Sequence, residues 1–312
     1  MEAVALQSKK EKSRVEELGS FIGSTPLFPI QHLSPKEDVN IYAKLEWQQF
    51  GASVKARPAY QIIKDAISKG ELGNGKAILD ATSGNTGIAY AHIGAALDIP
   101  VTLFMPENAS KERKTILRAL GVDLRFTPAD GGTDEAQQAA VDLYETEPEN
   151  YFYANQYDNP NNWKAHYHGT GPEIMEQTDG TITHFIAGMG TTGTFTGTGK
   201  YLKSANPAIQ IVGLQPEIAL HGLEGWKHLE TNRVPKIYDR SVGDEILPVS
   251  TDAAYEMMQK AASLEGLLIG PSGAANLAGA VEYAQRLEKG TIVTVLPDDS
   301  SKYGDVLETL MS

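Results

Sequence analysis

Residues 77–97, AILDATSGNTGIAYAHIGAAL, contain the repeating unit that decides the fold. A short apolar run, AILD, leads into a loop of small polar residues, and then into a segment with helical spacing from Thr86 to Leu97. The same order recurs with NIYAKLE before a helix over 58–69 and PVTLFMP before one over 110–120, and the strands THFIAG, IQIVGLQ and TIVTVLP follow. Strands separated by helices of this length imply crossover connections and a parallel sheet. The sequence therefore predicts an α/β protein.

The length and composition are those of a globular protein with about two domains. The chain has 312 residues, of which 41% are hydrophobic and 21% charged, and a domain averages about 150 residues. The alternation breaks over residues 147–162, EPENYFYANQYDNPNN, where Pro, Asn and Tyr accumulate. We therefore expect residues 48–160 to form a smaller, mobile domain, and residues 1–47 and 161–312 to form a larger one.

Net charge and cysteine content exclude several classes of function. Lys and Arg number 27 against 40 Asp and Glu, a net charge of −13, so nucleic acid and acidic membrane surfaces are poor partners. The chain has no cysteine, which excludes disulfides, thiolate metal sites and a cysteine nucleophile. The sequence shows neither a signal-peptide pattern nor a run of about 18 apolar residues. We expect a cytoplasmic protein that acts on small molecules without a metal.

Lys55 is the first candidate for chemistry. It lies in SVKARPA, three residues before Pro58. Proline is favoured in the first turn of a helix, so Lys55 is expected at the start of a helix, where α/β sheets gather ligands. An amine there forms a Schiff base when burial or nearby positive charge lowers its pKa. A surface lysine is the alternative from this string alone.

The loop ATSGNTG, residues 81–87, is the second candidate. It offers Thr82, Ser83, Asn85 and Thr86 between a strand and a helix. Backbone N–H groups and hydroxyls at a helix N-terminus bind a carboxylate or a phosphate. An ordinary capped turn is the alternative, although four polar side chains exceed what capping requires.

The third candidate is GMGTTGTFTGTG, Gly188–Gly199, directly after a strand. Its glycines satisfy G-x-G-x-x-G, which is typical of a dinucleotide site. Its hydroxyls, from Thr191, Thr192 and Thr194, suit a terminal phosphate bound by several donors equally well. Both interpretations remain open from this segment alone.

The fourth candidate, GPSGA at residues 270–274, opens a helix late in the chain. Its Ser272 either caps that helix or binds a polar atom of a ligand. Capping is the simpler interpretation of the motif in isolation.

Together and in this order, SVKARPA, ATSGNTG, GMGTTGT and GPSGA resemble the cysteine synthase branch of the fold type II pyridoxal-phosphate enzymes, which includes O-acetylserine and O-phosphoserine sulfhydrylases and cystathionine β-synthase. The resemblance extends from about Ser20 to Tyr303 and includes the string NQYDNPNNWKAHYHGTGPEI. It implies two open, twisted, mostly parallel sheets flanked by helices, with pyridoxal 5′-phosphate in the cleft between domains.

The resemblance also implies a role for each matching residue. Lys55 would be the internal aldimine lysine and later the base that moves the α-proton. Asn85 would bond the cofactor's 3′-hydroxyl, and Ser272 its pyridine nitrogen, which a neutral hydroxyl leaves unprotonated. The substrate carboxylate would be bound by Thr82, Ser83, Asn85, Thr86 and Gln156. The cofactor phosphate would be bound by Gly190, Thr191, Thr192, Gly193 and Thr194.

The reaction implied by the resemblance is β-replacement on an activated serine. O-acetylserine would lose its leaving group to give an aminoacrylate, and sulfide would add to give L-cysteine. Lys227 falls where phosphoserine-using relatives carry arginine, so it would contact substrate, and O-phosphoserine is the alternative donor. Condensation with homocysteine is the nearest alternative reaction, and a NAD-binding oxidoreductase built on the Gly188 loop is a remote one. Members of this branch are usually homodimers, so we expect a homodimer.

Overall fold

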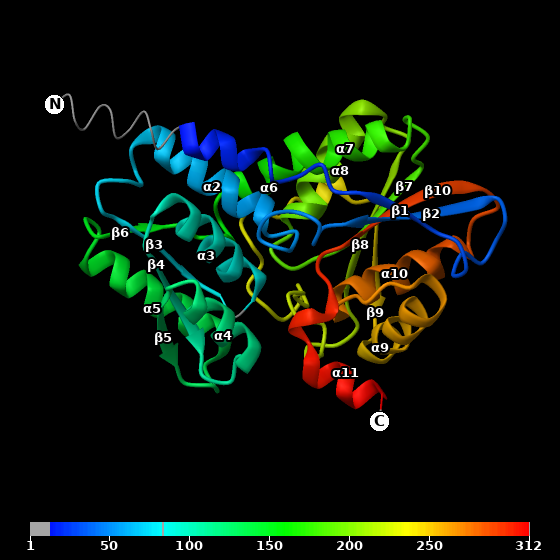
Figure 1. Ribbon diagram of the computed structural model, residues 1–312. Helices are drawn as coiled ribbons and strands as arrows, with labels where there is room; N and C mark the ends of the chain where they lie inside the picture. The colour runs from blue at the N-terminus through cyan, green and yellow to red at the C-terminus, as the bar shows by residue number, and fades with distance from the viewer. Residues whose placement is uncertain (1–12, 83, 312) are drawn as a thin grey trace. The chain divides into compact units, whose positions relative to one another are not determined.

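The computed structural model describes residues 13–82 and 84–311, which divide into two compact units. Unit 1 comprises residues 13–23, 49–51 and, apart from Ser83, 55–161. Unit 2 comprises residues 24–48, 52–54 and 162–311. Each unit has its own sheet flanked by helices (Figure 1), which confirms the predicted α/β class. None of the described helices has the length and apolar character needed to span a bilayer.

Unit 1 is built on four parallel strands in the order β5-β4-β3-β6. The strands are β3 (Ala77–Ala81), β4 (Val101–Pro106), β5 (Asp123–Thr127) and β6 (Tyr151–Tyr153). The helices are α2 (Ala56–Lys69), α3 (Asn85–Leu97), α4 (Lys111–Ala119) and α5 (Gly132–Thr146), and residues 13–19 are also helical. The three helices predicted in this part of the sequence correspond to α2, α3 and α4.

The two faces of β3 carry different partners because successive side chains of a strand point to opposite faces. Leu79 belongs to the apolar cluster that contains Ala136 of α5. Ile78 belongs instead to the larger cluster that contains Ile88 of α3. Asp80 has the parity of Ile78, so it lies on the face of the sheet covered by α3.

Unit 2 is built on six strands in the order β1-β2-β10-β7-β8-β9, all parallel except for the antiparallel β1-β2 pair. The strands are β1 (Leu27–Ile30), β2 (Val39–Leu45), β7 (His184–Gly188), β8 (Gln210–Pro216), β9 (Glu245–Val249) and β10 (Gly290–Leu296). The α-helices are α6 (Asn161–Ala165), which begins at the last residue of unit 1, α7 (Gly171–Gln177), α8 (Gly193–Ala205), α9 (Thr251–Lys260), α10 (Pro271–Ala284) and α11 (Gly304–Met311). Two π-helical turns, η1 (His166–Thr170) and η3 (Ala261–Glu265), and two 3₁₀ turns, η2 (Arg240–Val242) and η4 (Ser300–Lys302), complete the unit.

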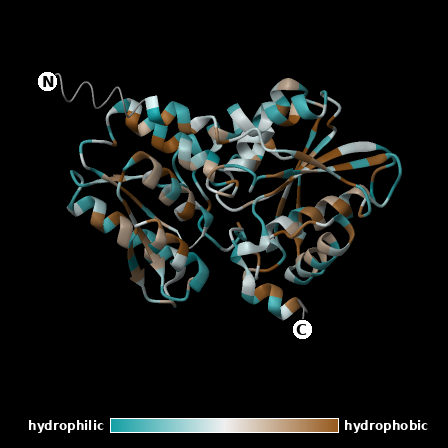
Figure 2. Ribbon diagram, viewed as in Figure 1, coloured by the Kyte–Doolittle hydropathy of each residue, from teal (hydrophilic) through white to brown (hydrophobic). Residues whose placement is uncertain are grey.

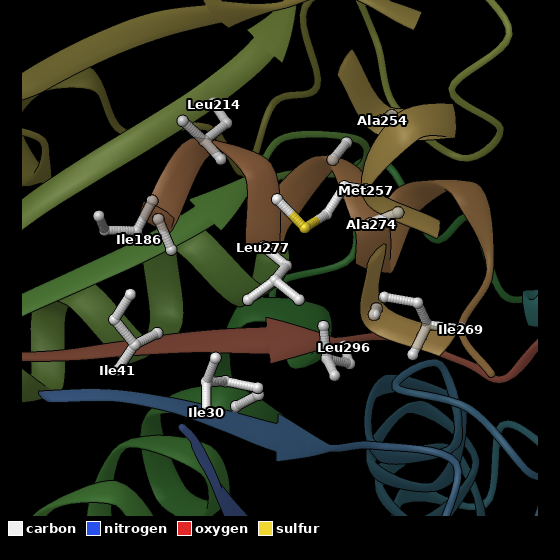
Figure 3. Close-up of a cluster of buried hydrophobic side chains, with 14 of the residues drawn as sticks. Ile30, Ile41, Ile186, Leu214, Ala254, Met257, Ile269, Ala274, Leu277 and Leu296 are labelled. Carbon is white, nitrogen blue, oxygen red and sulfur yellow. The ribbon is translucent and has the colours of Figure 1, made fainter. Parts of the chain in front are cut away.

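Helices cover both faces of the unit 2 sheet, with α7 and α8 on one side and α9 and α10 on the other (Figure 1). Phe185 of β7 packs in the cluster that contains Phe195 of α8, whereas its neighbour Ile186 shares a cluster with Leu277 of α10. Figure 3 shows Leu277 pointing from α10 toward the strands. Burial on both faces explains why these strands are apolar almost throughout, while the outer helix faces remain polar (Figure 2).

Candidate active site

Lys55 lies immediately before α2 in unit 1, with helical backbone angles of φ −73° and ψ −13°. Its carbonyl oxygen accepts a 3.1 Å hydrogen bond from the amide of Ala59, and its side chain is partly exposed. The helix begins at Ala56, two residues earlier than expected from Pro58. The structure therefore places Lys55 at the N-terminal end of α2.

The starts of α2 and α3 approach each other at Gly51. A methyl group added to Gly51 would lie 3.2 Å from Cβ of Ala56 and 3.8 Å from Cα of Ala89. Gly51 also has a φ of +89°, which favours glycine. Ala56 follows Lys55 directly, and Ala89 lies one helical turn after Asn85. Unit 1 thus brings Lys55 and the first turn of α3 to the same place.

The ATSGNTG loop forms an open helix N-terminus in unit 1. Gly84, at the N-cap of α3, has no side chain that could accept a hydrogen bond from the helix. It therefore leaves the N–H groups of the first turn available to a ligand. Thr82 is buried, and its Oγ1 accepts a hydrogen bond from the Gly84 amide at 3.2 Å. The hydroxyl of Thr86 donates to Oε1 of Gln156 at 2.6 Å. Two of the predicted carboxylate-binding residues, 70 positions apart, are therefore in direct contact.

Asp80 lies directly behind this loop, and sequence analysis did not identify it. Its Oδ1 accepts from the Ala81 amide at 2.8 Å, and its Oδ2 accepts from the Gln156 amide at 3.3 Å. Complete burial raises the pKa of this carboxyl group to about 7, against the amide hydrogen bonds from Ala81 and Gln156 and the nearby hydroxyl of Tyr90, which lower it. The sequence signal that could have identified Asp80 is an acidic residue within the otherwise apolar strand AILDA.

The loop after β7 in unit 2 is closely packed around its glycines. A Cβ atom on Gly190 would lie 1.8 Å from the carbonyl oxygen of Gly225, and one on Gly193 would lie 1.9 Å from Oδ1 of Asn162. Neither position therefore accepts a side chain without movement of its neighbours. The backbone N–H groups at the start of α8 are left uncovered by side chains of their own, as anion binding requires.

The threonines of this loop, Thr191, Thr192 and Thr194, are among the residues predicted to bind the cofactor phosphate. Thr192 has a φ of +69°, an unusual conformation for a β-branched residue, and its buried Oγ1 has no hydrogen-bond partner. Thr191 Oγ1 accepts from the Gly193 amide at 3.4 Å, and Thr194 Oγ1 lies 3.3 Å from Nε2 of the buried His166. A buried hydroxyl without a partner at a helix N-terminus fits an oxygen-rich anion such as a phosphate monoester. We call residues 190–194 the phosphate cup.

Ser272 lies in the first turn of α10 and is buried. One turn further on, Asn276 links this helix to the phosphate cup, and sequence analysis did not identify it. Its Oδ1 accepts from the amide of Gly188 at 2.6 Å, and its Nδ2 donates to the carbonyl oxygen of Val295 at 2.6 Å. Unit 2 therefore holds Ser272 and the phosphate cup in a fixed relation.

Lys227 follows a segment that packs on the phosphate-cup loop. Its amide donates to the carbonyl oxygen of Met189 at 2.8 Å. The ring of Trp226 lies 2.1 Å from where a Cβ atom of Gly188 would be, so only glycine fits beneath it. The structure places the backbone of Lys227 beside the loop that precedes Gly190.

These features define the class of protein. The chain belongs to the family of pyridoxal-phosphate dependent enzymes, whose family model matches residues 18–298. This match confirms the predicted family, enzyme class and cofactor, and it favours the phosphate interpretation of Gly188–Gly199 over the dinucleotide one.

More particularly, the chain is similar to cysteine synthases. It is 46% identical over 295 residues to the cysteine synthase of Aquifex aeolicus, covering 92% of this chain and 90% of that protein. It is 38% identical to the O-acetylserine dependent cystathionine beta-synthase of Bacillus subtilis, covering 93% and 96%. Among solved structures, the cysteine synthase of Entamoeba histolytica is 32% identical and superposes with a TM-score of 0.88 over 93% of this chain and 90% of that one.

Proposed function

We propose that this protein is a cysteine synthase: it replaces the β-substituent of an activated serine, first of all O-acetylserine, with sulfide, and so forms L-cysteine. The similarity to cysteine synthases supports the choice of reaction. The observation that carries it is local to unit 1, where the start of α2, with Lys55, meets the open N-terminus of α3 at Gly51.

The donors of unit 1 suit an amino-acid substrate. The uncapped first turn of α3 and the hydroxyl of Thr82, which accepts from Gly84 and keeps its own proton to donate, offer hydrogen bonds to a carboxylate. The side-chain oxygen of Gln156 accepts a hydrogen bond from Thr86, and the side-chain NH₂ group of Gln156 can still donate to a ligand. We assign these residues, together with Ser83 and Asn85, to the substrate carboxylate, and Asn85 also to the cofactor's 3′-hydroxyl.

The residues of unit 2 suit the two polar ends of the cofactor. Pyridoxal phosphate, when bound, supplies an aldehyde that links to amines and a ring that withdraws electrons from the substrate α-carbon. We assign its phosphate to the phosphate cup, where Thr192 Oγ1 lacks a partner, and its ring nitrogen to the hydroxyl of Ser272. The amine of Lys55 holds the aldehyde between turnovers, and once released it takes the α-proton of the substrate.

The test is product formation by the purified holoenzyme. O-acetylserine and sulfide should yield cysteine, identified by mass spectrometry. Lys55→Ala should abolish turnover, and borohydride should no longer fix the cofactor to the peptide that contains residue 55.

Thr86→Val tests the carboxylate assignment. It removes the donor to Gln156, and it should raise KM for O-acetylserine by about tenfold, the factor expected from one buried hydrogen bond. The matched control is Thr102→Val, which removes a hydroxyl that is equally buried but bonded to Asp123 on the neighbouring strand. Equal KM values for the two variants would contradict the assignment.

The choice of donor and acceptor is tested in the same assay. The Bacillus subtilis relative is named for the synthesis of cystathionine from O-acetylserine, so homocysteine is the competing acceptor. O-phosphoserine is the competing donor, with Lys227 pairing with its phosphate. Parallel reactions with each donor and each acceptor, compared by kcat/KM, identify the preferred pair.

The proposal also includes a homodimer in the cytoplasm, which rests on the family resemblance. Light scattering on the eluate of a size-exclusion column should give twice the 33.7 kDa mass of the chain. Fractionation of the source cells tests the location.

A further inference from the structure

Asp80 connects three segments of unit 1 behind the carboxylate-binding groups. Its two oxygens accept from the amides of Ala81, at the end of β3, and Gln156, after β6. The nearby hydroxyl of Tyr90, on α3, interacts with the same carboxyl group and lowers its pKa. Gln156 in turn accepts from Thr86 at 2.6 Å. The Gln156 side chain therefore reaches Thr86 from a backbone that Asp80 holds.

The surroundings of Asp80 are apolar or neutral. Tyr90 is fully buried and Tyr157 partly buried, and the pKa of each hydroxyl is raised by burial and by the nearby Asp80. Tyr153 on β6 also acts on Tyr90, and Asp134 on α5 acts on Tyr157. Each group on these elements that acts on Asp80 is a tyrosine hydroxyl or a backbone amide, and burial raises the pKa of its carboxyl group to about 7.

We propose that Asp80 is a positioning residue for substrate binding: its ionised carboxylate fixes the backbone of Gln156, and thereby the Thr86–Gln156 pair that receives the substrate carboxylate. The inference rests on the proposed function, because it takes Thr86 and Gln156 as substrate-binding residues. A carboxylate accepts both amides with charge-assisted bonds, which are about twice as strong as neutral ones. The protonated group holds them less strongly, so substrate binding should tighten as Asp80 ionises.

Asp80→Asn is the direct test. An asparagine offers one carbonyl oxygen, so either the Ala81 or the Gln156 amide loses its acceptor and faces an NH₂ group. We expect KM for O-acetylserine to rise about tenfold relative to wild type at about pH 8.5, and only about twofold at about pH 5.5, with kcat within about twofold throughout. The ratio of the two KM values isolates Asp80, because the other titrating groups are common to both proteins.

Asp134→Asn is the matched control, since it makes the same substitution beside the same tyrosine cluster at an exposed position. Its KM ratio to wild type should stay near one at each pH. A KM ratio for Asp80→Asn that does not change with pH would overturn the inference. If Thr86→Val also leaves KM unchanged, the proposed function is at fault; if Thr86→Val raises KM while the Asp80 ratio is flat, only the inference fails.

A measurement on the wild-type holoenzyme covers the case in which Asp80→Asn does not fold. With selective ¹⁵N-glutamine labelling, the amide proton of Gln156 should shift with pH and show a midpoint near 7, because its acceptor ionises there. The absence of such a transition would overturn the inference without any variant.

Discussion

Replacing Asp80 by asparagine should change how the stability of unit 1 depends on pH. Complete burial raises the pKa of Asp80 from 3.8 to about 7. Between these values the folded chain keeps a proton that the unfolded chain releases, so the free energy of unfolding of the wild type falls as pH rises through this window. An asparagine has no such proton and shows no such fall.

The size of the effect follows from the two pKa values. A difference of about three units corresponds to about 4 kcal/mol above pH 7, and the part lost between about pH 5 and about pH 8 is about 2.5 kcal/mol. Asp80→Asn also loses one acceptor for a buried amide, which costs about 1–3 kcal/mol at every pH. Relative to wild type, the variant should therefore gain about 2.5 kcal/mol on going from pH 5 to pH 8.

Hydrogen exchange of the buried amides in β3 and β4 measures this difference. Peptides from unit 2 provide the internal reference, because they contain no part of the Asp80 cluster. If the stabilities of wild type and Asp80→Asn remained parallel between these pH values, the carboxyl group of Asp80 would not be titrating as we describe. Ionisation of Asp80 would then neither cost stability nor strengthen substrate positioning.

Three further substitutions test other parts of the site. Gly190→Ala places a methyl group against the carbonyl oxygen of Gly225, and overpacking of this kind should weaken cofactor binding by about tenfold or more, measured by titrating cofactor-free protein with pyridoxal phosphate. Lys302→Met removes the 3.0 Å hydrogen bond to the carbonyl oxygen of Ala52, three residues before Lys55, and should lower kcat about tenfold, with recovery in Lys302→Arg. Lys227→Met should lower kcat/KM for O-phosphoserine by about tenfold while changing that for O-acetylserine less than about twofold, and equal losses would contradict a phosphate contact.

Periodicity predicts the regular elements because it depends on neighbours in sequence. The helix expected over 86–97 is α3, Asn85–Leu97, and the strand IQIVGLQ, residues 209–215, matches β8 (Gln210–Pro216) with a shift of one residue. Strand β5, DLRFT, is not predicted, because it lies at the edge of the sheet and its charged residues do not give the apolar pattern of a core strand. Strand β6 has three residues within the segment that we interpreted as a break, and it is stabilised by pairing with β3 and by packing of its aromatic side chains, which are contacts that local periodicity does not reveal.

The candidate site divides in the same way. The composition of loops such as ATSGNTG and GMGTTGT predicts ligand binding, because the backbone N–H groups and hydroxyls that would bind a ligand belong to the loop itself. The roles of Asp80 and Asn276 cannot be predicted in this way. Each depends on a hydrogen bond to a residue far away in the sequence, from the amide of Gln156 to Asp80 and from the amide of Gly188 to Asn276. In the sequence such residues are visible only as polar residues within an apolar segment, and the structure is needed to identify their hydrogen-bond partners.

The link made by Asn276 has a consequence for how the cofactor survives turnover. On the proposed roles, the covalent bond to Lys55 is given up in every cycle, so retention then depends on noncovalent contacts alone. Asn276 ties the helix of Ser272 to Gly188 at the end of β7, two residues before the phosphate cup. On these assignments both ends of the cofactor would be anchored to unit 2, so its release would require both contacts to open together. Slow release of the cofactor would then depend on this arrangement more than on the bond to Lys55.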